Sequence, residues 1–88
     1  MIEYKKVELK ETVLITCVKE KENVLSMGQS VFIGYFKSVN KDNSLTYKEY
    51  APIERVNYDD AMLDGIRLLN DYLETNNELI KKIDSIIL

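Results

Sequence analysis

The sequence contains no histidine and no tryptophan, and it has one cysteine and one proline. The absence of histidine removes the commonest general base, the usual partner of a catalytic nucleophile and the commonest zinc ligand. Cys17 alone cannot form an internal disulfide, and no companion ligands surround it in the sequence. We therefore expect no catalytic residues, no metal site and no cofactor.

Phosphate-binding loops are also missing, because the three glycines form neither of the common glycine-rich nucleotide motifs. No apolar run approaches the roughly 20 residues of a membrane span. The first residues, MIEYKKVELK, lack the apolar centre of a signal peptide. Together with the single cysteine, these features predict a cytoplasmic protein without membrane association.

The formal net charge is −3, and it is distributed unevenly. Residues 1–50 carry eight basic and seven acidic groups, whereas residues 51–88 carry four basic and eight acidic groups. The acidic half would repel a nucleic acid, whose binding depends on cations, so direct nucleic-acid binding is disfavoured. Abundant lysine, asparagine, isoleucine and tyrosine suggest an AT-rich coding genome, such as that of a low-GC bacterium or its mobile elements.

What is present predicts a single domain over residues 1–88, mainly β over 1–56 and mainly α over 57–88. The stretch from Val7 to Val18 is rich in β-branched residues and predicts one long or two short strands. The charged segment from Lys19 to Asn23 is interpreted as a turn. Val24 to Gln29 is open between a short strand, a helical turn and a loop.

A hairpin is predicted from Val31 to Val56, with turn residues at Asn40 to Ser44. The strand Val31–Val39 has apolar residues on both faces and should be central, whereas Pro52 pushes the returning strand towards an edge or a bulge. The register depends on the loop length, because a slip of one residue exchanges the faces. A five-residue loop places Val39 opposite Leu45, Tyr35 opposite Glu49 and Gly34 opposite Tyr50.

The apolar periodicity changes from two to about 3.6 after Val56, which predicts a helix. Asn57 is suited to be its N-cap, with Asp59 and Asp60 in the first turn. An apolar stripe and an opposite acidic stripe follow: the first contains Met62, Ile66, Leu69 and Leu73, and the second contains Asp60, Asp64, Arg67, Asp71, Glu74 and Glu78.

The segment ETNNELIKK gives two competing signals. Thr75 and Glu78 match a capping box, which would start a second helix. Ile80, Ile83 and Ile87 instead continue the first apolar stripe. We favour a break near Asn76, because an uninterrupted helix would bury its amide. The predicted fold is α+β: a small antiparallel sheet of three or four strands, followed by a C-terminal helix or a kinked helix pair on one face.

The hairpin rings and the acidic stripe are the candidate contact surfaces. The rings of Tyr35, Phe36, Tyr47 and Tyr50 either form core or present a stacking surface. We assign them mainly to the core, with Tyr47 and Tyr50 as the exceptions. The acidic stripe is either a solvated surface or an imitation of a phosphate row. Its candidate partner contacts are Asp60, Asp64, Asp71 and Glu74.

The chain ends in three consecutive apolar residues, from Ile86 to Leu88. Terminal residues fray unless they are held, so this tail either docks on the sheet or packs against a second subunit. Ile83, Ile86, Ile87 and Leu88 are the residues assigned to this role, and both alternatives, including a homodimer, stay open.

These features favour a non-catalytic module that binds another protein, such as a small regulator or inhibitor from a bacterial or phage mobile element. It would act by occluding the surface of its partner. The alternative is a nucleic-acid or nucleotide-binding sheet that uses the hairpin aromatics.

Overall fold

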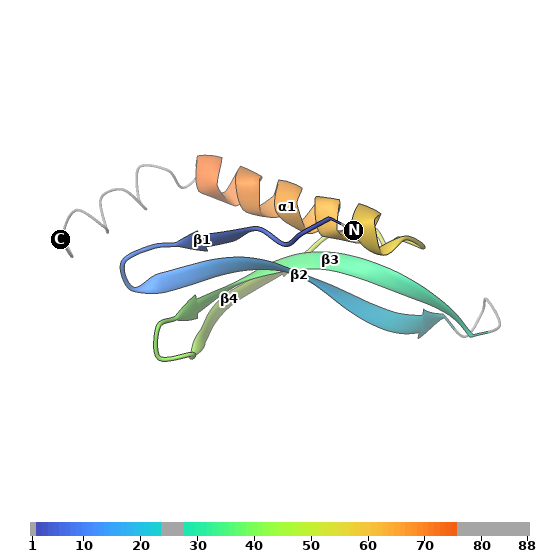
Figure 1. Cartoon of the computed structure of the whole chain (residues 1–88), viewed down its shortest axis with the longest axis horizontal. Coiled ribbons are helices and arrows are strands. Elements are labelled where there is room, and N and C mark those ends of the chain that lie inside the picture. The colour runs from blue at the N-terminus through green and yellow to red at the C-terminus, as the bar shows by residue number, and fades with distance from the viewer. Residues whose placement is uncertain (1, 24–27, 76–88) are drawn as a thin grey trace.

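The computed structural model describes residues 2–23 and 28–75. These residues form a four-stranded antiparallel sheet followed by a single helix, α1, so the α+β prediction is confirmed. The strands lie side by side in the order in which they occur in the sequence, and α1 lies across one face of the sheet (Figure 1). The elements are β1 (Lys6–Glu8), β2 (Thr12–Asn23), β3 (Gln29–Asn40), β4 (Leu45–Tyr50) and α1 (Tyr58–Thr75).

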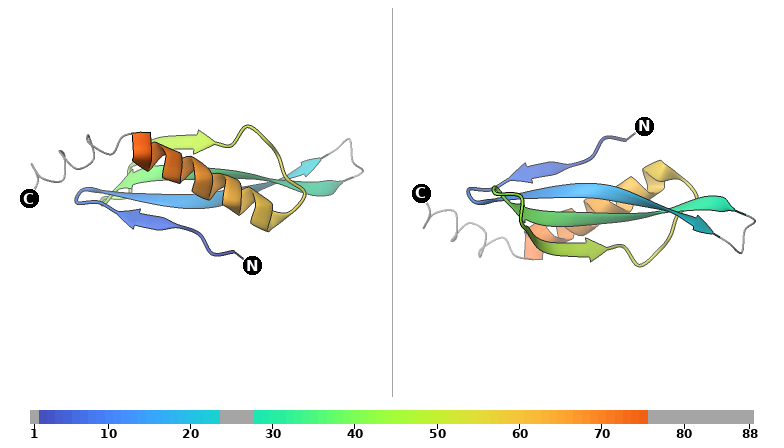
Figure 2. Two further views of the ribbon diagram at one scale, coloured as in Figure 1. Left: turned by 90° about the horizontal axis from the view of Figure 1, so that it is seen from above. Right: turned by 90° about the horizontal axis from the view of Figure 1, so that it is seen from below.

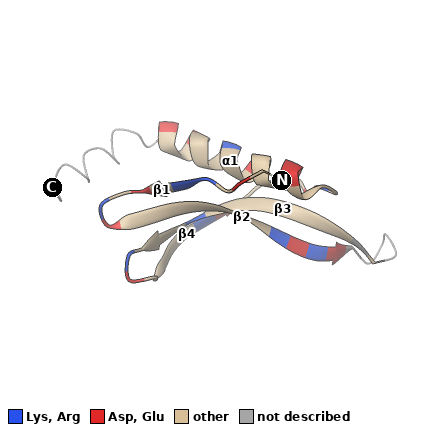
Figure 3. Ribbon diagram, viewed as in Figure 1, with Lys and Arg blue, Asp and Glu red and all other residues tan. Residues whose placement is uncertain are grey.

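The interpretation of residues 19–23 as a turn is wrong, because β2 continues through them. Lys19 pairs with Ile33 and Lys21 pairs with Val31 on β3. The charged run can form a strand because its backbone groups hydrogen-bond to the apolar strand β3, while its side chains reach solvent. The alternating charges are visible at the far end of β2 (Figure 3).

The predicted hairpin exists, and its first strand is central as expected, but the returning strand ends at Tyr50 rather than at Val56. Val39 lies opposite Leu45 as predicted, but a bulge between Ser38 and Val39 then shifts the pairing. The other two predicted pairs are therefore wrong. Tyr50 lies opposite Tyr35 rather than Gly34, and Glu49 lies opposite Phe36 rather than Tyr35. The bulge adds a residue to β4, a change that composition does not reveal.

Gly34 has a different role from the one that the register prediction gave it. A Cβ added at Gly34 would lie 1.8 Å from the carbonyl oxygen of Ala61 on α1. In the reverse direction, a Cβ at Gly65 would lie 2.9 Å from the carbonyl oxygen of Tyr35. Bare backbone on both elements therefore lets the helix pack directly on β3.

The core forms between α1 and the even-numbered positions of β2 and β3. Leu14, Phe36 and Leu69 are fully buried there, and Val7 and Tyr72 are among the half-buried residues that pack against them. Successive strand residues point to opposite faces, so the odd-numbered positions of both strands point away from α1.

Helix α1 begins where the sequence predicts. The Asn57 side-chain oxygen accepts hydrogen bonds from the backbone N–H groups of Asp59 at 2.7 Å and Asp60 at 3.4 Å. It thus satisfies donors that the first helical turn leaves free. The predicted break near Asn76 lies outside the described residues, as do Ile83, Ile86, Ile87 and Leu88.

Candidate binding face

The face of the sheet opposite α1 is called the open face here. Its central part consists of the odd-numbered residues from Val13 to Lys21 on β2 and from Val31 to Val39 on β3. Among the described residues, no element lies over it, and the view from below looks directly onto the strands with α1 behind them (Figure 2). Since the helix covers only one side of the sheet, the second layer of side chains faces outward.

Aliphatic residues occupy much of the open face. Val13, Ile15, Ile33 and Val39 are half-buried, and Leu45 on β4 is 57% exposed. A sheet with one solvated face usually alternates apolar residues inside with polar residues outside. The open face departs from that pattern, because partly exposed aliphatic side chains stand there among the lysines. Exposed apolar surface rimmed by polar residues marks interaction sites.

Two tyrosines form an aromatic pair on the same face. The ring centroids of Tyr35 and Tyr50 are 4.7 Å apart, with 35° between the ring planes. The ammonium group of Lys48 lies 5.1 Å from the centroid of Tyr35 and 5.4 Å from that of Tyr50. Burial raises the pKa of Tyr35 to about 12, with smaller contributions from Cys17 and Tyr50. The phenol of Tyr35 therefore stays neutral to higher pH than that of an ordinary tyrosine.

A row of lysines crosses the sheet next to these rings. The strand registers place Lys6 on β1 beside Ile15, Ile15 beside Lys37, and Lys37 beside Lys48. Three of the four strands thus contribute an ammonium group to one row. Like charges directly opposite on neighbouring strands destabilise a sheet, so the Lys37–Lys48 pair is a cost that the fold tolerates.

The hairpin rings do not form one platform, because the bulge divides them between the two faces. Tyr50 lies on the open face with Tyr35, whereas Tyr47 packs on the helix side. There Tyr47 stacks on Tyr72 at 5.6 Å, and Phe36 lies within 5.7 Å of both rings. The Tyr47 hydroxyl donates to Glu49 at 2.7 Å, and this bond raises the pKa of Tyr47.

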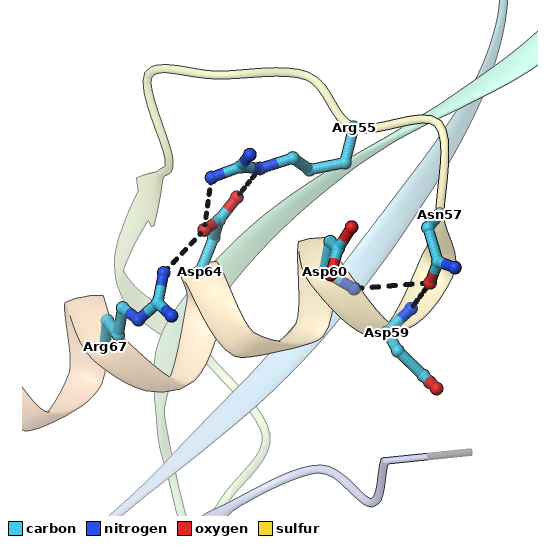
Figure 4. A network of polar contacts seen from close by, with 6 residues as sticks. All are labelled: Arg55, Asn57, Asp59, Asp60, Asp64 and Arg67. Atoms are coloured by element: carbon cyan, nitrogen blue, oxygen red, sulfur yellow. Dashed lines mark hydrogen bonds and ion pairs between the residues drawn. The ribbon is translucent and has the colours of Figure 1, made fainter.

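Asp64 does not lie on a solvated face as the acidic-stripe prediction has it. Its side chain is only 10% exposed, and its carboxylate accepts two hydrogen bonds from Arg55, at 2.7 and 3.1 Å (Figure 4). Arg67 approaches the same carboxylate at 3.5 Å. The carboxylate therefore holds the segment between β4 and α1.

The other predicted acidic contacts are exposed on α1. Asp60, Asp71 and Glu74 all face solvent. Asp71 and Tyr47 line a shared hollow between α1 and β4, together with Thr46 and Leu68. The structure thus brings one predicted acid and one predicted ring together, while Tyr50 lies on the opposite side of the sheet.

Sequence reasoning missed the lysine row, although part of its signal was present. Lys37 shares its parity with Ile33 and Tyr35, so its place on the open face follows from the strand alone. The place of Lys48 depends on the bulge and could not be inferred. In the part of the chain that the structure describes, no group of three or more potential metal-ligating side chains gathers.

No protein family, curated protein or solved structure was found to match the chain. Within residues 2–23 and 28–75, no helix combines the length and the apolar character that a bilayer span requires.

Proposed function

We propose that this chain is a non-catalytic module that binds another protein through the open face of its sheet. The observation that carries the proposal is the aliphatic surface of β2 and β3, which no described element covers. Fully burying such a side chain contributes about 1.5–3 kcal/mol of free energy. Because these residues are only half-buried in the chain, a partner that covers them would gain part of this free energy on binding. Several of them together supply the apolar centre that a specific interface needs.

The mode of action proposed is occlusion. A sheet face covers a partner's surface without needing a cleft. The chain would act in this way as a small cytoplasmic regulator or inhibitor. The composition points to a bacterial or phage mobile element as its source. Helix α1 supports this role by holding the sheet rigid from behind, since Gly34 and Gly65 bring the two layers into direct backbone contact.

The test is capture from a bacterial host lysate with matched baits, followed by reconstitution with the purified captured protein. One bait is wild type and one carries Ile15→Thr with Ile33→Thr, because threonine keeps the β propensity but removes apolar surface. The control bait carries Asp71→Asn with Glu74→Gln on α1. We expect the open-face bait to lose the captured protein and the helix bait to keep it, with all three melting alike.

Recovery that the open-face substitutions leave unchanged would contradict the proposal. If only the helix substitutions abolish recovery of the captured protein, the contact would lie on the acidic stripe instead.

Nucleic-acid binding is the second candidate function, and the Tyr35–Tyr50 pair with Lys48 is the observation that favours it. Stacked rings beside lysines bind single strands without sequence preference. Titration with a single-stranded oligonucleotide tests it through quenching of tyrosine emission. Oligonucleotide affinity that falls steeply with added salt, and quenching that disappears in Tyr50→Ala, would support this function.

A further inference from the structure

In the described part of the chain, helix α1 and the open face of the sheet carry charge of opposite sign. Helix α1 carries five carboxylates and one arginine. The described part of the open face carries five lysines, Lys6, Lys19, Lys21, Lys37 and Lys48, with Glu8 and Glu54 as its acids. The net charge of −3 therefore conceals a sheet face of opposite sign. Charged groups on opposite layers act separately when they are about a Debye length apart.

Internal ion pairs neutralise only part of that face. Lys6 lies 3.4 Å from Glu8, and Lys21 lies 2.6 Å from Glu54. Among the described residues, no carboxylate lies within ion-pair distance of Lys37 or Lys48, and these two lysines are direct cross-strand neighbours. An anion placed between them would relieve their repulsion, so the folded chain already contains a favourable position for a negative group.

We propose that the partner presents an acidic and apolar protein surface, with a carboxylate that bridges Lys37 and Lys48 while apolar side chains cover Ile15 and Ile33. This inference rests on the proposed function and specifies the chemistry of the partner. Complementary charge at an interface selects the partner and accelerates its association.

A second copy of the chain fits this face less well. Lys37 lies on the central strand β3, so two open faces packed together would set the lysine rows against each other. Like charges brought together at an interface oppose association and exclude wrong partners.

A nucleic acid fits less well for a different reason. Among the described residues, one pair of rings lies on the open face, and the side chains beside it are lysines and aliphatic residues, which do not stack on bases. The acidic helix behind the sheet further weakens attraction to a long polyanion.

The experiment selects peptides from a random display library on the immobilised full chain. We expect the selected peptides to contain an excess of aspartate and glutamate interspersed with apolar residues. The best peptide is then synthesised and titrated against wild type, Lys37→Glu and Lys41→Glu. Both variants change the net charge equally, but Lys41 lies in the turn between β3 and β4. Lys37→Glu should also fold well, because it creates an opposite-charge pair with Lys48.

We expect Lys37→Glu to weaken peptide binding about tenfold or more, and Lys41→Glu to change it by no more than about twofold. Wild-type affinity should fall as salt is added. Selected peptides without an acidic excess, or equal binding by wild type and Lys37→Glu, would overturn the inference.

Parallel measurements separate the competing occupants. If the chain binds an oligothymidylate and Lys37→Glu abolishes this binding, the partner would be a nucleic acid rather than an acidic protein. If sedimentation shows a dimer that Ile33→Thr dissociates, the partner would be a second copy of the chain. Peptides that are not acidic but are lost in the Ile15→Thr, Ile33→Thr variant would overturn only the charge inference. If those substitutions affected no peptide, the proposed function would fail as well.

Discussion

At the scale of single residues, glycine decides how the two layers meet. Gly34 sits under the first turns of α1, and the nearest atom to a Cβ there is a backbone oxygen of the helix. A backbone atom inside a helix cannot swing aside as the end of a side chain does, so the helix itself would have to move. The position of α1 thus depends on the absence of one methyl group.

We expect Gly34→Ala to lower the free energy of unfolding by about 3 kcal/mol or more, since overpacking a closed contact costs about 1–3 kcal/mol and rises with the clash. Urea unfolding measures the change. Gly65→Ala is the comparison, because its Cβ would meet Tyr35 at 2.9 Å and alanine favours a helix. Its loss should be smaller. Equal stability of Gly34→Ala and wild type would contradict the described contact.

Tyr35 gives a prediction about pH. Its pKa in the folded chain, about 12, lies above the ordinary value of 10.0, mainly because of burial. Folding therefore favours the neutral phenol. The resulting stabilisation is complete below about pH 10 and is lost as the pH rises through about 12.

Titration of tyrosinate absorbance should show a late-ionising tyrosine that Tyr35→Phe removes. The same substitution should flatten the decline of stability over this pH range. A step near pH 12 that persists in Tyr35→Phe would assign that pKa to another tyrosine.

At the scale of elements, the connection between β4 and α1 is fastened at two points. Arg55 exchanges two backbone hydrogen bonds of 2.6 Å with Phe32 on β3, and its guanidinium clasps Asp64 on α1. The segment thus joins strand β3 to the helix that covers the sheet. Figure 4 shows this clasp beside the N-cap of α1.

We expect Asp64→Ala to destabilise the fold by about 1–3 kcal/mol, because it removes a charge-assisted bidentate bond from a nearly buried site. Asp71→Ala removes an exposed carboxylate from the same helix and should cost about 0.5 kcal/mol or less. Thermal unfolding of both variants measures the difference. Equal effects would mean that the clasp contributes no more than an ordinary surface charge.

The N-cap gives a second test at this scale. Replacing Asn57 with alanine should cost about 1 kcal/mol, whereas Asn57→Asp keeps an acceptor for the same N–H groups and should cost little. Chemical denaturation of the two variants provides the comparison. A loss of similar size in both would assign the role of Asn57 to something other than its side-chain oxygen.

The sequence was sufficient for features that depend on local periodicity. The α+β order, the central strand after Val31 and the N-cap at Asn57 all follow from patterns within a few residues of one another. The continuation of β2 through Lys19 did not, because a charged run becomes a strand only when a neighbour supplies the hydrogen bonds. The bulge next to Ser38 likewise depends on pairing across the hairpin.

The candidate site was predictable only in part for the same reason. Tyr50 lies on the open face, but its companion Tyr35 and the neighbouring Lys48 became identifiable only with the shifted register. Asp64 fitted the acidic stripe by spacing alone. Its partner Arg55 comes from a loop whose path the sequence does not specify, so its burial could not be foreseen.

At the scale of the whole molecule, stability should be concentrated in the two long strands. β2 and β3 pair over 12 residues, and the helix packs on both of them, whereas β1 has three residues and lies at an edge. Regions with more packing and more hydrogen-bonded neighbours open less often.

We therefore expect amide hydrogen exchange to be slowest for residues 13–18 and 34–38 and fastest in β1. Exchange followed by NMR measures the order directly. Amides of Lys6 to Glu8 that outlast those around Phe36 would contradict the described distribution of packing.

The division between even-numbered and odd-numbered positions on β2 and β3 has one more consequence. Positions such as Leu14 and Phe36 hold the layers together, while positions such as Ile15 and Lys37 contribute little to that task. The second set is therefore free to diverge. A lineage with this architecture can acquire new targets by exchanging alternate residues along two ribbons, and a protein engineer can randomise the same residues to obtain binders from a constant scaffold.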